Sequence, residues 1–346
     1  MQLFFDCYHL RELNTRPKAV KASTYRRYGP PDVLEMTERP KPVPRDHELL
    51  IRIRATTVSS ADWRMRSLEM PHGFGLLARL ALGIGGPRKS ILGSELAGEV
   101  EAVGRAVTTF EVGDEVFGFS GVGLGCHAEY RCFPANGAVA PKPSNLSFEQ
   151  AAALCFGGTT MLDFFRRGEL RSGERVLVNG ASGTVGSAAV QLAKHFGAHV
   201  TGVCSAANVK LVQSIGADEV IDYAERDFAQ SEVPFDVIVD TVGTAPFARS
   251  GPVLSRGGRL LLVLASLPEL LKAPWHTLTS GKRVIAGPAA ERPEYARLLG
   301  EIAAAGRFVP VVDRCYSFEQ MADAHRYVDR GHKRGSVVIT FGASGA

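Results

Sequence analysis

The chain has 346 residues and a mass of 37.2 kDa, which indicates two domains if each holds about 150 residues. Hydrophobic residues make up 45% and charged residues 22%, a composition that excludes wholesale disorder. The formal net charge of +4 is too small a surplus to predict electrostatic binding of nucleic acid or of a membrane.

No apolar run approaches the roughly 20 residues of a membrane-spanning helix, so we expect no span. The first nine residues lack the basic start and long apolar core of a signal peptide. The cysteines are scattered and form no CxxC pair, which is typical of free thiols in a reducing compartment. We therefore expect a cytoplasmic protein. The cysteines are Cys7, Cys126, Cys132, Cys155, Cys204 and Cys315.

Residues 1–16 show no clear period, and we treat them as an N-terminal extension without assigned chemistry. From Lys18 onward, short segments alternate apolar and polar residues and are separated by glycines. This pattern predicts a compact β-rich domain. The expected strands are Ala19–Tyr25, Leu49–Val58, Leu96–Val103 and Glu115–Phe119.

The character of the chain changes near Pro141, where a helix is expected over Ser147–Arg166 with an interruption near Gly157 and Gly158. Short, continuously apolar strands then alternate with helices, which predicts a parallel sheet buried on both faces. The expected strands are Arg175–Asn179, His199–Cys204, Val220–Tyr223, Phe235–Thr241, Leu260–Ala265 and Val284–Ala286, and the expected helices are Gly186–Phe196, Val209–Ile215 and Glu294–Ala305. A strand at Val309–Arg314, a helix at Phe318–Arg330 and a strand at Val337–Phe341 are expected to form a tail.

The segment Val176–Gly186 predicts a strand, a glycine-rich turn and a helix start. Backbone N–H groups and the helix dipole make such a helix start a site for a pyrophosphate group. Ala181, Gly183 and Gly186 occupy the three glycine positions of the dinucleotide fingerprint. An ordinary strand-to-helix turn is the alternative, but the following strand–helix units favour a dinucleotide site. We expect Ser182, Gly183, Thr184, Val185 and Gly186 to contact the cofactor.

The strand after this turn predicts which dinucleotide binds. An NAD site usually carries Asp or Glu about 20 residues after the turn, to bind the 2′-hydroxyl of the adenosine ribose. Residues 203–208 contain no acidic side chain, and Ser205, Lys210 and Tyr223 are available to bind a 2′-phosphate. We therefore predict NADP(H), although Lys210 is equally compatible with a solvated helix position.

In combination and in order, several motifs resemble the medium-chain dehydrogenase/reductase superfamily, and within it the zinc-independent, zeta-crystallin-like quinone oxidoreductases. The resemblance covers Pro17–Phe341. It implies an α/β fold in which a doubly wound Rossmann sheet (141–290) follows a GroES-like catalytic domain (17–140), to which residues 291–346 return. The motifs are Gly93–Gly98, Val103–Gly104, Gly113–Gly118, Ala151–Leu154, Gly216–Tyr223, Asp240–Gly243 and Gly257–Arg259.

The positions that would hold catalytic zinc depart from the pattern of the zinc-dependent members. Ser94 stands where those members have a histidine ligand, and Ser59 and Ser60 stand where a cysteine ligand is expected. Hydroxyl groups do not replace imidazole and thiolate around zinc. Cys126, His127 and Cys132 lack a fourth partner in sequence, so we predict no metal.

Without zinc, we expect hydride transfer from NADPH to a small, hydrophobic, conjugated acceptor, either a quinone or an α,β-unsaturated carbonyl, because an enolate spreads the developing charge. Ser60, Asp62 and Arg64 are the candidate catalytic residues, with a helix cap as the alternative role of Asp62. The resemblance adds a set of cofactor contacts. These are Thr159, Val242, Gly243, Leu264, Ala265 and Arg334.

Three further questions stay open at this point. An NADP-dependent alcohol dehydrogenase or carbonyl reductase, and a cofactor-binding scaffold with little turnover, are the alternative functions. The apolar segment Pro71–Ile84 is either a wall of the substrate site or a helix that covers the β domain. Residues 260–265 and 284–286 would extend a sheet across a homodimer if they lie at its edge.

Overall fold

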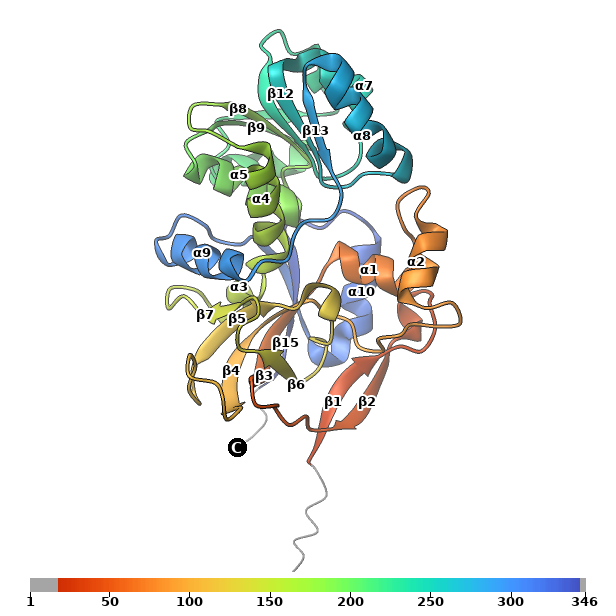
Figure 1. The fold of residues 1–346 in the computed structure, drawn as a ribbon, viewed down its shortest axis with the longest axis vertical. Coiled ribbons are helices and arrows are strands. Elements are labelled where there is room, and N and C mark those ends of the chain that lie inside the picture. Colours follow the sequence, from red (N-terminus) through yellow and green to blue (C-terminus); the bar gives the residue numbers. More distant parts are fainter. Residues whose placement is uncertain (1–17, 343–346) are drawn as a thin grey trace, which may run out of the picture.

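The computed structural model describes residues 18–342, which form two sheet-based domains (Figure 1). The first contains a seven-stranded sheet in the order β14-β15-β3-β4-β5-β7, with β6 paired to β3. A separate hairpin of β1 and β2 lies beside it. The bounds are β1 Ala19–Thr24, β2 Glu35–Pro40, β3 Glu48–Val58, β4 Glu95–Val103, β5 Glu115–Phe119, β6 Tyr130–Pro134, β7 Val139–Pro141, β14 Val312–Ser317 and β15 Ser336–Thr340.

The second domain is built on a six-stranded sheet in which every neighbouring pair is parallel. The strand order is β10-β9-β8-β11-β12-β13, so the chain reverses its direction of progress between β8 and β11. Ligands of open parallel sheets bind at such a switch point, beyond the carboxyl ends of the strands. The bounds are β8 Arg175–Asn179, β9 His199–Cys204, β10 Glu219–Asp222, β11 Phe235–Asp240, β12 Leu254–Leu262 and β13 Arg283–Ala286.

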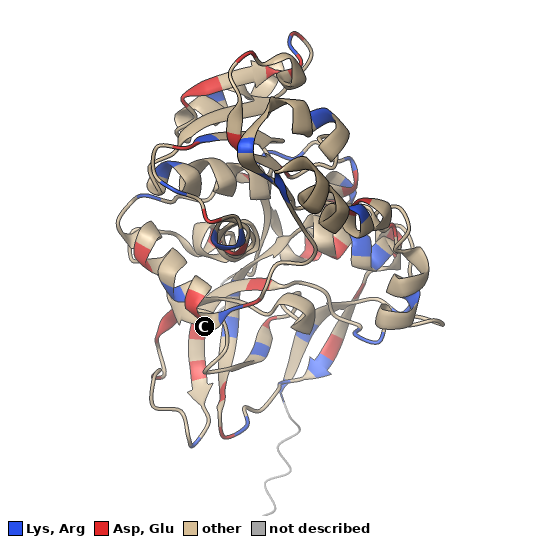
Figure 2. Ribbon diagram, turned by 45° about the horizontal axis from the view of Figure 1, so that its top comes forward, with Lys and Arg blue, Asp and Glu red and all other residues tan. Residues whose placement is uncertain are grey.

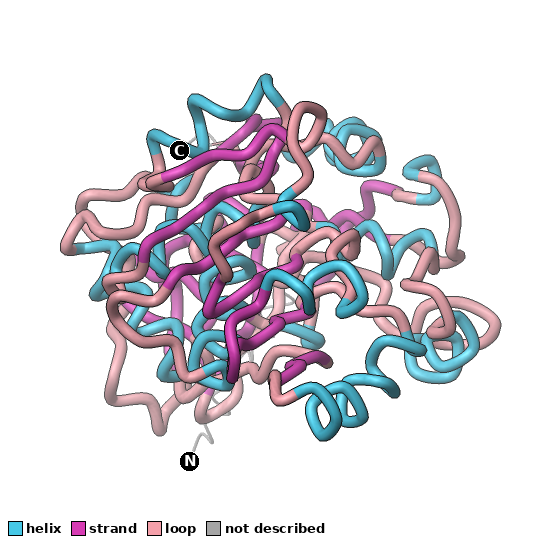
Figure 3. The backbone as a smooth tube through the Cα atoms, turned by 90° about the horizontal axis from the view of Figure 1, so that it is seen from above, coloured by secondary structure: helices cyan, strands magenta, loops and turns pink. Residues whose placement is uncertain are grey.

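Helices cover this sheet on both sides, as the view from above shows (Figure 3). Alternate residues of β8 enter different cores: Val176 and Val178 pack into one cluster and Leu177 into the other. Because successive side chains of a strand point to opposite faces, burial on both faces requires a continuous apolar run. The helices of this part of the chain are α3 Phe148–Ala152, α4 Cys155–Gly168, α5 Thr184–His195, α6 Val209–Ser214, α7 Phe247–Ser250, α8 Leu267–Ser280 and α9 Pro293–Ala304. Two of them do not cover this sheet: α3 packs on β3 and β4 of the first domain, and α9 packs on α4 and β7.

The C-terminal part of the chain returns to the first domain. Helix α10 (Met321–Asp329) follows β14, and β15 then pairs antiparallel with β3, with Val337 opposite Val58. Charged residues of both signs are interspersed over both domains in the view of Figure 2. Within residues 18–342 the structure contains no helix with the length and apolar character to cross a bilayer.

The structure corrects the expected interruption of the helix after Ser147. The break lies between α3 and α4, at Ala153 and Leu154, whereas Gly157 and Gly158 lie inside α4. A Cβ atom on Gly157 would come within 2.6 Å of the carbonyl oxygen of Thr184. These glycines therefore mark close packing of α4 against its neighbours and do not break the helix.

Other differences concern elements with weak periodic signals. Helix α8 was not among the expected elements, and β12 begins at Leu254, six residues before the expected strand. Helices α1 (Ser60–Ser67) and α2 (Gly75–Leu82) correspond to the helical alternatives for Asp62 and for Pro71–Ile84, although no residue of α2 is buried. The start of β12 carries Gly257 and Gly258, which interrupt its apolar pattern.

Candidate active site

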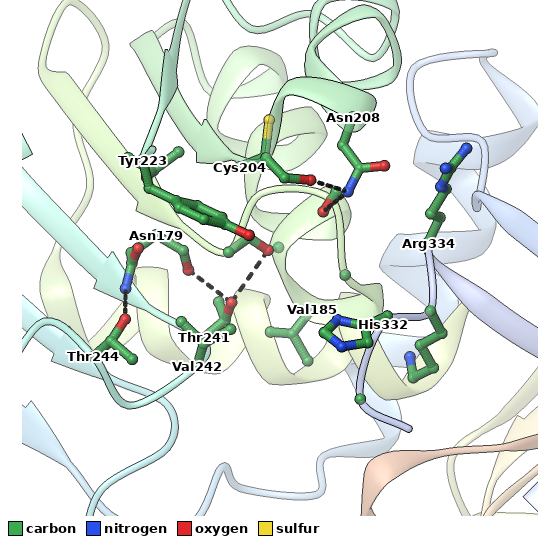
Figure 4. A pocket seen from close by; sticks show the side chains of 18 of the residues that line it. Asn179, Val185, Cys204, Asn208, Tyr223, Thr241, Val242, Thr244, His332 and Arg334 are labelled. Carbon is green, nitrogen blue, oxygen red and sulfur yellow. Dashed lines mark hydrogen bonds between the residues drawn. The ribbon is translucent and has the colours of Figure 1, made fainter. Parts of the chain in front are cut away.

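A cavity of about 780 Å³ lies where the two domains meet, beyond the carboxyl ends of β8, β9 and β11 (Figure 4). Most of its wall comes from the six-stranded domain. The first domain contributes Ser60, at the start of α1, and the loop Gly331–Arg334 between α10 and β15. A cavity in this position is the expected ligand site of such a fold.

The glycine-rich turn forms the floor of the cavity. Gly180 has a φ of +83°, and a Cβ atom on Gly186 would lie 2.0 Å from the Gly180 carbonyl oxygen, so both positions require glycine. Gly183 precedes α5 with a φ of −78°, and a Cβ atom there would meet only the Gly180 oxygen, at 3.7 Å. The first turn of α5 leaves backbone N–H groups without helical partners. The predicted residues 182–186 all line the cavity.

The loop before β15 joins the turn to the first domain. The Gly335 backbone N–H donates to the Ser182 carbonyl oxygen at 2.8 Å, and Thr184 Oγ1 donates to the Gly335 carbonyl oxygen at 2.6 Å. Lys333 Nζ donates to Thr184 Oγ1 and also to the Gly335 oxygen. Burial of this ammonium group lowers the pKa of Lys333 to about 8. A cation from the first domain therefore lies at the N-terminus of α5.

The end of the cavity beyond β9 and β10 is polar and basic. Asn208 Nδ2 donates to Ser182 Oγ at 3.1 Å and to Ser205 Oγ at 3.2 Å. Tyr223 and Arg334 also line this cavity, as predicted, whereas Lys210 is exposed and does not line it. Four cationic side chains belong to the lining, and none of the lining residues is Asp or Glu. These cations are Arg226, Arg249, Lys333 and Arg334.

Two buried polar residues at strand ends shape the wall between β8 and β11. Asn179 Nδ2 donates to Asp240 Oδ1 at 3.0 Å and to Thr244 Oγ1 at 2.9 Å. Asp240 is fully buried and accepts the backbone N–H groups of Val242, Gly243 and Ala245. Val242 lines the cavity, whereas the predicted contacts Gly243, Leu264 and Ala265 are outside the lining. Asn179 and Asp240 were not predicted, although a polar residue that ends an apolar strand signals such a role.

The catalytic candidates fall in different places. Ser60 lines the cavity, together with Phe156 from α4. Asp62 is fully buried, and its Oδ2 accepts hydrogen bonds from Ser59 N at 2.8 Å and Ser59 Oγ at 2.6 Å. Its Oδ1 accepts from Gly93 N at 2.9 Å. Both carboxylate oxygens of Asp62 are therefore engaged in capping α1 and fixing the neighbouring loop.

Two other predicted residues also lie outside the cavity lining. The Arg64 guanidinium sits over the Trp63 ring, 4.9 Å from its centroid, and donates to the Glu69 carbonyl oxygen at 3.3 Å. Thr159 is buried in α4, where its hydroxyl donates to the Cys155 carbonyl oxygen at 2.7 Å. The structure brings together Ser60, the turn and the basic end, and it separates Asp62, Arg64 and Thr159 from them.

Glu95 is a buried acid next to Phe156, behind the end of the cavity that Ser60 and Phe156 line. Its Oε1 accepts the backbone N–H of the cavity residue Phe156 at 2.5 Å, and its Oε2 accepts the Thr57 hydroxyl at 2.5 Å. Burial raises the pKa of Glu95 to about 7, against the opposing effect of these hydrogen bonds and of Lys333. The carboxyl group holds the start of α4 against β3.

The donor groups in this region do not match a zinc site. Ser59 donates to Asp62, and the buried hydroxyl of Ser94 has no hydrogen-bond partner. His127 uses Nε2 on the Thr57 carbonyl oxygen at 2.9 Å. Over residues 18–342, no three side chains of His, Cys, Asp or Glu gather in a way that would hold a metal ion. Hydroxyl groups, and carboxylates whose oxygens already accept hydrogen bonds, do not supply a tetrahedral zinc shell.

Comparisons with known proteins agree with this architecture. Residues 45–144 match the model of the alcohol dehydrogenase GroES-like domain, and residues 215–339 match a model described as zinc-binding dehydrogenase. A chloroplastic quinone-oxidoreductase homolog of Spinacia oleracea is 32% identical, over 93% of this chain and 98% of its own length. The 2-methylene-furan-3-one reductase of Solanum lycopersicum is 31% identical, over 93% of this chain and 79% of its own.

Solved structures give the same result. The quinone oxidoreductase of Coxiella burnetii superposes with a TM-score of 0.82 at 28% identity, covering 93% of this chain and 99% of its own. The full-length matches include both domains in the same order, and the cavity lies at the fold's expected cofactor site. The chain therefore belongs to the medium-chain dehydrogenase/reductase superfamily, in its quinone oxidoreductase branch, whose fold carries a nicotinamide cofactor.

Proposed function

We propose that this protein is an NADPH-dependent reductase of quinones or α,β-unsaturated carbonyl compounds that works without zinc. The observation that carries the proposal is the wall of the cavity, which contains the helix start that binds phosphate in this fold, four cations and no carboxylate. One of these cations, Arg249, is paired with Asp227 at 2.9 Å, and the other three form no ion pair with the described residues. Relatives named as quinone oxidoreductases and as a 2-methylene-furan-3-one reductase support the acceptor class.

The residues present fit a phosphorylated dinucleotide. The N–H groups at the start of α5 and the ammonium of Lys333 would hold the pyrophosphate. Ser205, Asn208, Tyr223, Arg226 and Arg334 would surround the phosphate on the adenosine ribose, where an NAD-specific site usually has an acid. The preference for NADP(H) follows from this charge balance, because a guanidinium binds phosphate through charge-assisted hydrogen bonds.

The nicotinamide end is the part of the cavity where Ser60 and Phe156 meet the turn. When bound, a reduced nicotinamide supplies a hydride to the conjugated carbon of the acceptor. The Ser60 hydroxyl then donates a hydrogen bond to the acceptor oxygen as negative charge develops there. A proton from water completes the reduction. Delocalisation of charge over the enolate makes a few such donors sufficient without a metal.

A panel of acceptors tests this proposal. After dialysis against a chelator, the protein is assayed for reduction of quinones, enones and saturated ketones with NADPH. It is also assayed for oxidation of alcohols with NADP⁺. We expect turnover of the quinones and enones that the chelator leaves unchanged. We expect little turnover of the saturated ketones and alcohols. Turnover of alcohols that depends on added zinc would support an alcohol dehydrogenase instead, and NADPH binding without turnover of any acceptor would support a scaffold.

A homodimer is part of the same proposal. Strand β13 ends the six-stranded sheet and pairs on one side only, with β12. Helix α8 packs on β13, and its exposed face carries Leu271, Trp275 and Leu278. A second copy that pairs its own β13 with this strand would cover that face.

Scattered free thiols support the expected cytoplasmic location.

A further inference from the structure

Helix α2 and the two residues that follow it (75–84) form an outward-facing surface, which we call the apolar lobe. No residue of α2 is buried. Leu76 is 73% exposed, Leu77 and Leu80 are each 50% exposed, and Ile84 is 70% exposed. A surface helix usually turns its apolar stripe toward the core. This helix does the opposite, so its leucines contribute little to the packing of the first domain.

Cations without carboxylate partners surround the apolar lobe. Arg79, Arg88 and Lys89 are exposed, and none forms an ion pair with the described residues 18–342. Lys89 Nζ donates to the carbonyl oxygens of Val122 and Gly123, so the two arginines are the cations available to a ligand. Between residues 63 and 94 the only acidic side chain is Glu69. The charge around the lobe is therefore positive, although the net charge of the whole chain is only +4.

Two more arginines join this group through the fold. The Tyr28 hydroxyl donates to the Gly83 carbonyl oxygen at 3.0 Å, and Tyr25 N donates to the Ser90 carbonyl oxygen at 2.9 Å. These contacts hold the loop that carries Arg26 and Arg27 beside the lobe. Both arginines are exposed. Apolar side chains and unpaired cations thus share one projecting part of the molecule.

Backbone contacts connect the segment before the apolar lobe with elements that adjoin the active site. The backbone of His72, just before α2, accepts a hydrogen bond from Leu267 N at 2.9 Å, where α8 begins beyond the end of β12. Helix α1, which starts at the cavity residue Ser60, precedes α2 in the chain, and Figure 1 shows the two helices side by side. The leucines themselves do not line the cavity.

We propose that the apolar lobe docks on the surface of a bilayer that contains anionic phospholipid. Leu76, Leu77, Leu80 and Ile84 would enter the interface between headgroups and acyl chains, while the arginines contact lipid phosphates. A helix of eight residues gives reversible, peripheral binding. The role of this contact rests on the proposed function: docking would hold the enzyme at a membrane in which an apolar quinone dissolves.

Co-sedimentation with vesicles tests the docking directly and without any assay of activity. The protein is mixed with vesicles of phosphatidylcholine alone or of phosphatidylcholine with phosphatidylglycerol. We expect binding to the anionic vesicles that weakens with added salt. In the triple variant Leu76→Ser/Leu77→Ser/Leu80→Ser, binding should weaken by at least about tenfold, because three exposed apolar side chains are lost. Arg79→Gln/Arg88→Gln should weaken binding to anionic vesicles selectively.

The matched control replaces exposed valines elsewhere. Val43 is 82% exposed and Val233 is 50% exposed, and Val43→Ser/Val233→Ser should bind vesicles like the unmodified protein. Reduction of a water-dissolved quinone should be unchanged in the triple variant, while reduction of a quinone held in vesicles slows. Vesicle binding without quinone turnover would support the docking proposal and contradict the proposed function.

Any one of three results would overturn the docking. The first is an unmodified protein that stays in the supernatant at every lipid concentration, and the second is a triple variant that sediments with the vesicles equally well. The third is a triple variant whose sedimentation coefficient, without vesicles, falls from that of a larger oligomer to that of a smaller one. This third outcome would assign the apolar lobe to contact with another copy of the chain.

Discussion

Glu95 makes the stability of the protein depend on pH. Because burial raises its folded-state pKa from 4.5 to about 7, the folded protein holds a proton that the unfolded chain releases between these values. The contribution of this group is therefore present below the unfolded pKa and is lost as the pH rises through the folded pKa.

Glu95→Gln tests that linkage, since glutamine keeps most of the shape and does not ionise. Between about pH 5 and about pH 8, the unmodified protein should lose roughly 2 to 3 kcal/mol more unfolding free energy than the variant does. Urea unfolding of both proteins at the two pH values gives the difference. Parallel pH dependences in the two proteins would contradict a buried, protonated Glu95.

Lys333 should make cofactor binding depend on pH. Its folded-state pKa of about 8 lies below its ordinary value, so its charge is present below pH 8 and fades above it. Lys333→Met should weaken NADPH binding by about tenfold or more, as expected for a lost charge-assisted hydrogen bond. It should also remove the fall in affinity above about pH 8.

Lys210→Met is the matched control, because Lys210 is exposed and lies outside the cavity lining. Titration of NADPH by fluorescence should show little change for this variant. If both variants lose the same affinity for NADPH, the loss comes from the change in net charge, and Lys333 makes no specific contact with the cofactor.

Single residues divide sharply into those that the sequence predicts and those that it does not. The turn residues Gly183 and Gly186 were predictable, because the fingerprint depends on local backbone geometry. The cap formed by Asp62 was one of two readings, and only its hydrogen bonds to Ser59 and Gly93 show how both oxygens are used. Lys333 is adjacent to the predicted Arg334, but its contact with Thr184 joins residues 149 positions apart.

At the scale of elements, the turn before α5 has one glycine position with room for a side chain, Gly183, and one without, Gly186. Gly186→Ala places a Cβ atom 2.0 Å from a backbone oxygen, whereas Gly183→Ala finds its nearest atom at 3.7 Å. We expect Gly186→Ala to cost about 3 kcal/mol or more of unfolding free energy and to abolish cofactor binding. Gly183→Ala should cost less than about 1 kcal/mol.

Urea unfolding and NADPH titration of these two variants make the comparison. Because the substitutions are chemically identical and three residues apart, each serves as the control for the other. Equal stability of the two variants would contradict the close approach of Gly186 to Gly180.

The elements of the six-stranded sheet follow from the sequence because burial on both faces leaves a strong apolar run in each strand. Helix α2 was hard to predict for the opposite reason. Its leucines face outward, so the apolar pattern of Pro71–Ile84 signals burial that does not occur. Helix α8 carries Pro268 in its first turn, where proline is tolerated, and Pro274 in its interior, where proline normally argues against a helix.

At the scale of the whole molecule, the open edge at β13 predicts the oligomeric state. Trp275 is 66% exposed and Leu278 is 83% exposed on α8, next to that edge. We expect the unmodified protein to sediment as a dimer and Trp275→Glu/Leu278→Glu to sediment as a monomer, because the glutamates would be buried unpaired in the interface. A dimer that survives both substitutions would place the interface elsewhere.

The distribution of charge over the molecule was not predictable from its sum. The net charge of +4 excludes a strongly basic protein, but it hides a cavity lined by four cations and an apolar lobe with unpaired arginines. The residues of these groups come from distant parts of the sequence, such as Arg226 and Arg334. Only the fold brings them together.

The central claim is that a phosphorylated dinucleotide drives the reduction of a conjugated acceptor from this cavity. The most direct test compares kcat/KM for NADPH and NADH with one quinone as acceptor. Because the cavity offers cations and no acid to the adenosine ribose, NADPH should be favoured by about tenfold or more. A kcat/KM for NADH equal to or above that for NADPH would contradict the claim.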